Sequence, residues 1–298
     1  MRYQIVHLTE YAYGEPVPLC HNVARLRPRE TGRQTCLRHE LDISPSPAVL
    51  RHQADFFGNP VAAFSVQNSH LLLSVTARSE VEVGPAAAGN ALFPVSWEEA
   101  ASLLAAGRDP EARLARQFVF ESPQIRPHAE LAAYAQPSFP PGRPLTEALL
   151  DLTRRIRDEF RFVKGSTAVG TPVMDVFRGR QGVCQDFAHL EIACLRSMGL
   201  AARYVSGYIV TEPPPGQPRQ PGADASHAWV SAWVPGSDWV DLDPTQGRFA
   251  DEDHLTVAWA RDYDDVAPLK GILLGGRQQS LRVAVDVIPV PDGDVSAT

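Results

Sequence analysis

The stretch from residue 184 to residue 242 constrains the fold most, because the spacing of its apolar residues changes along the way. Between residues 184 and 198, apolar side chains recur every three or four positions, which predicts one helix, and Gly199 is placed to end it. Continuous apolar and β-branched runs follow, and these predict strands. The predicted strands are residues 202–210, 228–234 and 239–242. A helix followed by several strands indicates an α+β unit.

The first 85 residues have a different pattern. Aromatic and β-branched residues are frequent from Tyr3 to Tyr13, and later short runs are separated by turn signals such as Gly58-Asn59-Pro60. This pattern predicts an antiparallel sheet or a small sandwich. At 298 residues the chain is long enough for two compact units. We therefore expect a β-rich N-terminal domain followed by an α+β core.

Helical patterns connect these two units. Two segments rich in Ala and Leu, residues 97–107 and 110–118, precede a proline-rich stretch, and residues 146–160 then predict an amphipathic helix with Thr146 as its N-cap. Residues 281–290 alternate as a late strand. The predicted units are an N-terminal β-rich domain at 1–85, a helical connecting region at 86–145, an α+β core at 146–290 and a tail at 291–298.

Charge and composition exclude several classes of protein. The net charge is −7 and the isoelectric point is near 5.7, whereas phosphate and anionic membranes are bound by clustered Lys and Arg. No run approaches the roughly 18 consecutive apolar residues of a spanning helix, and the first residues lack the apolar core of a signal peptide. Four scattered cysteines without a CxxC pair predict reduced thiols. We expect a cytoplasmic protein with no nucleic-acid or membrane partner, and the sequence leaves its oligomeric state open.

Three short motifs have the residue types of cysteine catalysis. Cys184 lies within GVCQDFAH, His227 within SHAW and Asp243 within DLDPT. A thiol needs a neighbouring imidazole to become a thiolate near neutral pH, and the imidazole needs an acceptor on its other nitrogen. The predicted helix start at Cys184 adds the positive end of the helix dipole. The motifs therefore predict a nucleophile, a base and an orienting carboxylate.

Other interpretations of these residues stay open. A cysteine is more often a small buried apolar residue, as expected of Cys194 on the apolar face of the predicted helix. Gly182, two residues earlier, favours a functional role for Cys184, because a glycine permits a close approach of the backbone. Adjacent antiparallel strands can place His227 beside Asp243, but Asp241 is two residues away on the same face. Strand register alone does not separate the two aspartates.

These motifs resemble the core of the bacterial transglutaminase-like superfamily. The similarity covers about residues 146–247, where the three motifs occur in the family's order. The β-rich N-terminal region and the YDDVAP stretch at residues 263–268 are similar to the subgroup with a bacterial N-terminal extension. The resemblance implies a papain-like α+β core, in which the helix bearing the cysteine packs on an antiparallel sheet. It also implies Cys184 as nucleophile, His227 as base and Asp243 as the orienting carboxylate.

Further candidate residues follow from the expected mechanism. The backbone N–H of Cys184 and, secondarily, the side chain of Gln181 are candidates for stabilising an oxyanion. Trp229 and Trp239 are candidates for shielding the site from water, although large aromatic residues on strands more often fill a core. Tyr208 is a pocket candidate with the same alternative of core packing.

The sequence favours an enzyme that forms a thioester on Cys184. Gln185 follows the nucleophile where the eukaryotic cross-linking enzymes carry an aromatic residue, and their calcium-binding insertions have no evident counterpart. Hydrolysis of an amide, peptide or isopeptide bond is therefore the favoured function. Acyl transfer to a primary amine and a non-catalytic binding protein on the same fold are the alternatives. No cofactor or metal ion is expected, because the adjacent acids Asp264 and Asp265 do not form an oxygen cage.

Overall fold

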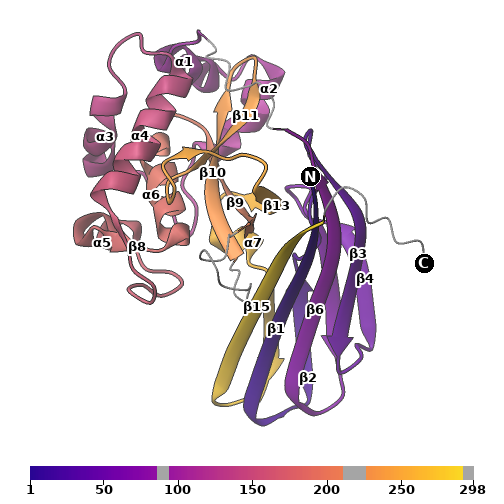
Figure 1. Cartoon of the computed structure of the whole chain (residues 1–298). Helices are drawn as coiled ribbons and strands as arrows, with labels where there is room; N and C mark the ends of the chain where they lie inside the picture. The colour runs from indigo at the N-terminus through magenta and orange to yellow at the C-terminus, as the bar shows by residue number, and fades with distance from the viewer. Residues whose placement is uncertain (86–93, 211–225, 291–298) are drawn as a thin grey trace, which may run out of the picture.

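The N-terminal region forms a β-sandwich. The computed structural model describes residues 1–85, 94–210 and 226–290. The sandwich strands are β1 (Arg2–Val17), β2 (Leu19–Ala24), β3 (Gln34–Ser44), β4 (Val49–Ala54), β5 (Pro60–Val66), β6 (His70–Val83), β14 (Leu269–Leu274) and β15 (Gln279–Val290). They form two antiparallel four-stranded sheets of order β15-β1-β6-β3 and β14-β2-β5-β4 (Figure 1). Buried side chains such as Val75 of one sheet and Phe64 of the other share one core.

The last two strands correct the domain division predicted from the sequence. β15 pairs with β1, with Val290 opposite Arg2, and β14 pairs with β2. Assigning residues 146–290 to the α+β core is therefore wrong for these strands, which complete the sandwich. The alternating pattern identified residues 281–290 as a strand but not its partner, because that partner lies at the other end of the chain. The proposed tail at 291–298 and the first residues of the connecting region lie outside the described residues.

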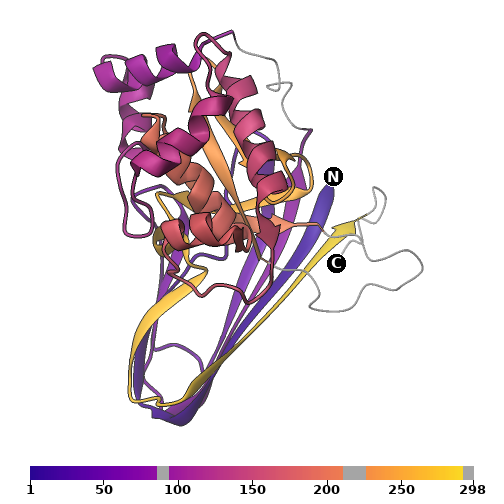
Figure 2. The ribbon, with the colours of Figure 1, turned by 90° about the vertical axis from the view of Figure 1, so that its left-hand side faces the viewer.

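The second unit packs helices against a five-stranded antiparallel sheet (Figure 2). Its strands are β9 (Ala202–Ile209), β10 (Ser226–Val234), β11 (Asp238–Asp243), β12 (Arg248–Phe249) and β13 (His254–Ala260), in the order β12-β11-β10-β9-β13. Its helices are α1 (Trp97–Ala106), α2 (Pro110–Ala115), α3 (Ala129–Ala135), α4 (Leu145–Glu159), α5 (Val173–Gly179), α6 (Cys184–Ser197) and α7 (Tyr263–Val266). Short elements complete it: η2 (Arg116–Phe118), η3 (Gln136–Ser138), and the parallel pair β7 (Arg161–Phe162) and β8 (Gln181–Gly182). The expected α+β fold is confirmed.

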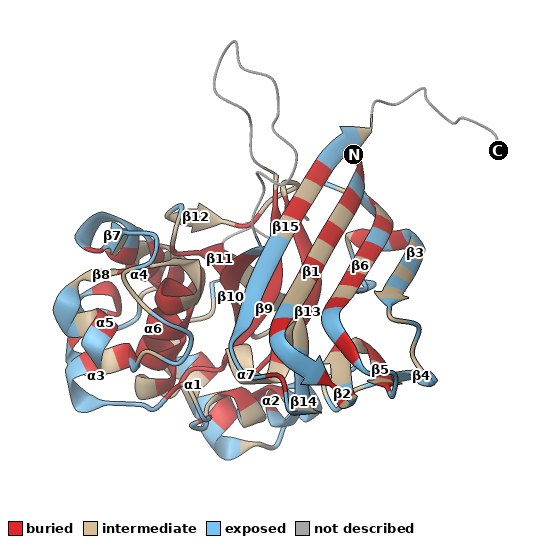
Figure 3. Cartoon of the chain, turned by 90° about the horizontal axis from the view of Figure 1, so that it is seen from below, coloured by how far each residue is buried: buried red, intermediate tan, exposed pale blue. Residues whose placement is uncertain are grey.

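Helix α6 occupies the centre of this unit. Its residues from Asp186 to Arg196 are all buried, between the sheet and the neighbouring helices (Figure 3). Gly199 ends the helix in the left-handed conformation, with φ of 75°. The helix predicted from residue 184 and the strands predicted after it are confirmed. The helix predicted at 146–160 is α4, but Thr146 is not its N-cap, because Pro144 holds that position and Thr146 is buried.

The sandwich covers the outer edge of the five-stranded sheet. β13 is an edge strand, and the side-chain amide of Gln34 bonds to both backbone groups of Thr256, at 2.7 and 2.8 Å. Asn59 does the same for Trp259, at 3.0 Å in both directions. The Arg29 guanidinium lies 3.7 Å from the centre of the Trp259 ring. These side chains take the place of a neighbouring strand, and they fix β13 relative to the sandwich.

Candidate active site

The backbone before Cys184 is fixed by local contacts. Cys184 is the first residue of α6 and is partly exposed. The Asp186 carboxylate accepts hydrogen bonds from the N–H of Val183 at 2.8 Å and from the Thr167 hydroxyl at 2.6 Å. Gly182 makes room for this carboxylate, because a Cβ at that position would lie 2.8 Å from the Cβ of Asp186. These contacts therefore fix the backbone at the start of the helix that carries Cys184.

His227 links the sulfur to a carboxylate. It is the second residue of β10 and is 8% exposed. Its Nε2 atom lies 2.8 Å from Oδ2 of Asp243, and the imidazole also interacts with Cys184. Burial lowers the pKa of His227, but the hydrogen bonds to Asp243 and Cys184 outweigh burial and raise this pKa to about 9. The imidazole is therefore positively charged near neutral pH.

The Asp243 carboxylate is fully buried and has a donor at every side. Oδ1 accepts hydrogen bonds from the N–H groups of Thr245 at 2.8 Å and Gln246 at 3.2 Å. Oδ2 accepts from His227 and from His254, the latter at 3.1 Å. Burial raises the pKa of Asp243, but the two histidines outweigh burial and hold this pKa below its ordinary value. Asp243 is therefore a carboxylate throughout the physiological range.

Strand pairing separates the two candidate aspartates. Leu242 of β11 lies opposite Val230 of β10, and Asp241 lies opposite Ser231. Asp243, one residue further on, is thus displaced diagonally from His227 within side-chain reach. Asp241 lies one full side-chain repeat further away. The aspartate in contact with His227 is Asp243.

Cys184, His227 and Asp243 form a series of contacts in that order, in which His227 is hydrogen-bonded to Asp243 and interacts electrostatically with Cys184. The series places a sulfur nucleophile next to an imidazolium that can donate a proton, and a carboxylate holds the imidazolium from the other side. The N–H of Cys184 is at the start of α6, where the first N–H groups have no acceptor within the helix. The site can therefore offer a nucleophile, a proton donor and an oxyanion donor to one carbonyl group.

Comparisons with known proteins identify the family of the chain. Residues 3–82 match the bacterial transglutaminase-like N-terminal region, and residues 132–244 match the transglutaminase-like superfamily. An uncharacterized protein of Mycobacterium tuberculosis is 42% identical over 98% of this chain and 94% of its own. The chain belongs to the transglutaminase-like superfamily. The resemblance drawn from the motifs is confirmed for both regions.

Two further comparisons concern parts of this transglutaminase-like protein or its fold. The protein-glutamine gamma-glutamyltransferase of Pseudomonas aeruginosa is 34% identical over 38% of this chain and 16% of its own. A solved structure from Cytophaga hutchinsonii, described as a candidate cysteine protease, superposes with a TM-score of 0.74. The sequences are 21% identical, and the superposition covers 96% of this chain and 90% of the other. The two proteins share the whole two-unit fold.

The helices of the described residues were also compared with the requirements for a membrane span. Within residues 1–85, 94–210 and 226–290, no helix combines the length and the apolar character needed to cross a bilayer.

The two tryptophan candidates have different places in the transglutaminase-like unit. The Trp229 ring is fully buried, and its centre lies 6.1 Å from that of His227 and 5.2 Å from that of His254. It therefore borders both imidazoles from inside the core. Trp239 packs edge-on against Phe118 in a separate apolar cluster, with ring centres 5.2 Å apart.

The other two pocket candidates contact residues outside the series of Cys184, His227 and Asp243. Tyr208 is buried, and its hydroxyl lies 2.8 Å from Nδ1 of His7 on β1, so it joins the transglutaminase-like unit to the sandwich. Gln181 is on β8, where it pairs with Arg161 of β7 just before the helix that begins at Cys184.

Sequence reasoning missed His254, which contacts Asp243 from the start of β13. The alternation of polar and apolar residues from His254 to Val257 is a signal that predicts a strand. That signal gives no partner for the imidazole, because the contact depends on how β13 is placed in the sheet. The family match ends at residue 244, so this histidine also lies beyond the matched region.

Two groups of described side chains have the residue types of metal ligands. They are His227, Asp243 and His254, and Asp251, Asp253 and His254, and within each group the polar atoms lie within 4.8 Å of one another. The 2.8 and 3.1 Å separations between Asp243 Oδ2 and the imidazole nitrogens are those of hydrogen bonds. The pKa values of both imidazoles are raised, to about 9 and about 10, against the effect of burial. We therefore interpret both groups as hydrogen-bonded ion pairs that hold protons.

Proposed function

We propose that this protein is a cysteine-dependent hydrolase that cleaves an amide, peptide or isopeptide bond through a thioester on Cys184. The observation that carries the proposal is the series of Cys184, His227 and Asp243, with Cys184 partly exposed at the start of α6. Membership of the transglutaminase-like superfamily supports it. A peptide or amide is the proposed substrate. A cytoplasmic location is part of the proposal and is supported by the chain's four free cysteines.

In the first half of the reaction, Cys184 takes the acyl group. The thiolate sulfur attacks the carbonyl carbon, and a sulfur–carbon bond forms as the carbonyl π electrons move to oxygen. When the tetrahedral intermediate collapses, the carbon–nitrogen bond breaks and the His227 imidazolium donates its proton to the leaving amine. The products are a free amine, a neutral imidazole and a thioester on Cys184.

In the second half, water takes the acyl group from the sulfur. The neutral imidazole of His227 accepts a proton from water as the water oxygen attacks the thioester carbon. The carbon–sulfur bond then breaks, which releases a carboxylic acid and restores the thiolate beside an imidazolium. Asp243 keeps its negative charge in both halves and holds the ring in one orientation.

The oxyanion of both tetrahedral intermediates needs hydrogen-bond donors. We propose the backbone N–H of Cys184 as one donor, because it lies at the positive end of α6. The side chain of Gln181 is the second candidate, since β8 leads directly into the residues before the helix. Trp229, buried against His227, keeps water from the far side of the imidazole.

Acyl transfer to a primary amine is a second candidate function. The similarity to the protein-glutamine gamma-glutamyltransferase of Pseudomonas aeruginosa favours it, at 34% identity over 38% of this chain. The same thioester serves both functions, and only the acceptor differs. Hydrolysis is the first candidate because water needs no binding site of its own.

Two measurements test the proposal. The first is the rate of iodoacetamide alkylation of each cysteine between about pH 4 and pH 9, read by mass spectrometry. Cys20, Cys36 and Cys194 are internal controls, because all three are buried and lie away from the series. We expect Cys184 to react fast below about pH 7 in the wild type and to lose this advantage in His227→Ala.

The second measurement supplies a glutamine-rich protein together with a labelled primary amine and identifies the products by mass. Deamidated or cleaved products indicate hydrolysis, and incorporation of the label indicates acyl transfer. A Cys184 that reacts like an ordinary thiol in the wild type would contradict both functions and favour a non-catalytic binding protein.

A further inference from the structure

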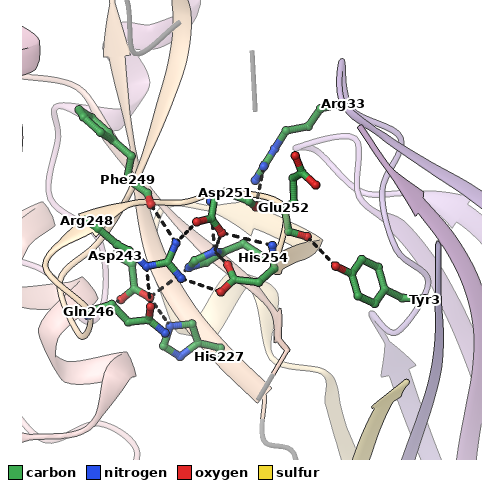
Figure 4. A network of polar contacts seen from close by, with 11 residues as sticks. Tyr3, Arg33, His227, Asp243, Gln246, Arg248, Phe249, Asp251, Glu252 and His254 are labelled. Atoms are coloured by element: carbon green, nitrogen blue, oxygen red, sulfur yellow. Dashed lines mark hydrogen bonds and ion pairs between the residues drawn. The ribbon is translucent and has the colours of Figure 1, made fainter. Parts of the chain in front are cut away.

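Asp243 has a second histidine partner that the proposed mechanism leaves unused. The Nε2 atoms of His227 and His254 lie 2.8 and 3.1 Å from the same oxygen, Oδ2 of Asp243 (Figure 4). His254 is only 1% exposed, so its ring cannot satisfy its nitrogens with bulk water. The carboxylate that orients His227 is therefore itself held by another imidazole.

We propose that His254 is a positioning residue of the active site, which fixes the Asp243 carboxylate so that Asp243 can fix His227 toward Cys184. This inference rests on the proposed function, because it assigns a partner to the orienting carboxylate of that function. His254 does not touch the reacting atoms. It acts on His227 through Asp243 and, with its ring centre 6.0 Å from that of His227, through its own positive charge.

The other nitrogen of His254 also has close partners, among them the backbone N–H of Asp251 at 3.3 Å. Nδ1 lies 2.5 Å from Oδ1 of Asp253 and 3.5 Å from Oδ1 of Asp251. Arg248 pairs with both of these carboxylates, with its Nη2 atom 2.6 Å from Oδ2 of Asp253 and Nη1 in contact with Asp251. The ring of His254 thus has anionic partners on both sides and one orientation that serves them both.

The charges of this group balance when both imidazoles are protonated. Three carboxylates, those of Asp243, Asp251 and Asp253, then face three cations, those of His227, His254 and Arg248. Asp243 and the two histidines are buried, and buried ions are tolerated when they are paired in this way. Burial lowers the pKa of His254, but its bonds to the three carboxylates outweigh burial and raise this pKa to about 10.

The sandwich holds the turn that precedes His254. The backbone carbonyl of Asp251 accepts a hydrogen bond from Nη1 of Arg33 at 2.7 Å, and that of Glu252 accepts one from the Tyr3 hydroxyl at 3.3 Å (Figure 4). Arg33 immediately precedes β3 and Tyr3 lies on β1. The N-terminal domain therefore reaches Asp243 through two hydrogen bonds, one short turn and one imidazole.

Geometry explains what this arrangement adds. A carboxylate with one donor on Oδ2 can tilt until that donor alone is satisfied, and the His227 ring tilts with it. A second donor on Oδ2 and two backbone N–H groups on Oδ1 leave one orientation that satisfies all four. Displacements of about 1 Å in catalytic groups cost rates of roughly 100-fold, so a fixed carboxylate matters for reactivity.

A purely structural role is the competing explanation, since the same ion pairs join β12 and β13. The two roles separate in a pair of variants. His254→Gln keeps an N–H donor that reaches Asp243 but removes the charge, whereas His254→Ala removes both. His189→Gln is the matched control, because His189 is a buried histidine of the same unit that bonds to the backbone of Tyr263.

The test measures the pH profile of Cys184 alkylation by iodoacetamide in the full-length protein, together with the thermal midpoint of each variant. We expect His254→Ala to slow alkylation at pH about 6.5 by roughly 10-fold to 100-fold. His254→Gln should recover most of this rate, to within about threefold of the wild type. In His254→Gln, the change in alkylation rate that follows deprotonation of His227 should move to higher pH, because a nearby cation no longer opposes protonation of His227.

Specific results would overturn the inference. One such result is that both His254 variants keep the wild-type rate and the wild-type pH profile of Cys184 alkylation. Another is that alkylation slows in both His254 variants only in proportion to their loss of thermal stability, as it does in His189→Gln. In that case His254→Gln would react no faster than His254→Ala. Should His254→Ala fail to fold, the alkylation rate and the pH profile of His254→Gln still test the inference. If Cys184 of the wild type reacts like an ordinary thiol, the proposed function itself is contradicted. If Cys184 is activated but its reactivity does not depend on His254, this inference alone is contradicted.

Discussion

The two ends of the His227 imidazole differ in how they are held. On one side is Cys184, the first residue of a helix and partly exposed. On the other side is Asp243, fully buried and bonded to four donors. A thiol enzyme needs a sulfur that a substrate can reach and a carboxylate that does not move. The structure meets the first need with exposure and the second with burial.

The origin of the contacts differs as well. Around Cys184 the supporting residues are close in sequence, such as Gly182 and Asp186. Around Asp243 they come from separate strands and, through Arg33, from the sandwich. The nucleophile therefore depends on one helix start, whereas the orienting carboxylate depends on the assembled fold.

Replacing Cys184 with alanine tests the exposed end and should have the largest effect. Loss of the nucleophile is expected to reduce product formation by about 10⁴-fold or more. The thermal midpoint should change by only about 2 °C, because the side chain is partly exposed. Cys194→Ala is the control, a buried cysteine of the same helix whose loss should cost about 1 kcal/mol and leave activity per folded molecule intact. Mass spectrometry of products and circular dichroism make the measurement, and an active Cys184→Ala protein would exclude cysteine catalysis.

The buried end is tested by a pair of aspartate variants. Asp243→Asn keeps the shape of the side chain but loses the charge that holds His227 protonated, so kcat should fall by about 10² to 10⁴-fold. Asp241→Asn should stay within about threefold of the wild type, since Asp241 lies further along β11. Steady-state kinetics at neutral pH give the comparison. Equal effects of the two substitutions would contradict the assignment of Asp243.

The ion pairs at the buried end should make stability depend on pH. The pKa of folded His254 is about 10 against an ordinary value of 6.5, so its stabilisation is complete below about pH 6.5 and is lost as the pH rises through about 10. The free energy of unfolding should fall over this range by about 1 to 3 kcal/mol more in the wild type than in His254→Gln. The charged groups around this ring are Asp243, Asp251, Asp253, His227 and Arg248.

Urea unfolding at several pH values across that interval measures the difference. Glu191 of α6 also titrates there, because burial raises its pKa to about 8. It does so in both proteins, so the difference between them reports His254 together with the change that its loss makes in the protonation of His227, whose pKa is about 9. Parallel stability curves would show that the imidazole carries no pH-dependent stabilisation.

The smallest effect is expected where the buried end meets the sandwich. Arg33→Ala removes the hydrogen bond to the Asp251 carbonyl and should slow Cys184 alkylation by about twofold to fivefold. Arg38→Ala is the control, because Arg38 forms an exposed ion pair with Glu40 on the sandwich surface. Identical rates in the two variants would break the link between the sandwich and the site.

The contrast between the two ends also explains how much could be predicted from the sequence. The helix start at Cys184 and the strands bearing His227 and Asp243 have local patterns, so they were predictable residue by residue. The choice of Asp243 over Asp241 required the register of β10 and β11. The contact of His254 required the placement of β13, which the side chains of Gln34 and Asn59 help to fix from the other unit.

The sandwich shows the same limit of prediction. Alternation identified residues 281–290 as a strand, and yet the local pattern is equally compatible with either unit. Pairing with β1 brings together the first and last described strands of the chain. Such a pairing is decided by the free energy of the whole fold, which a short window of sequence does not contain.

The return of β14 and β15 to the sandwich makes the second unit an insertion within the first (Figure 1). During synthesis, the inserted unit is complete before the final strands of its host leave the ribosome. Closure of the host sheet then has to wait until β15 has been made and has paired with β1, which is far from it in the sequence. Deleting either β1 or β15 would therefore disrupt the same sheet. Such a shortened form would lose the intact sandwich and, with it, the contacts that hold the turn before His254.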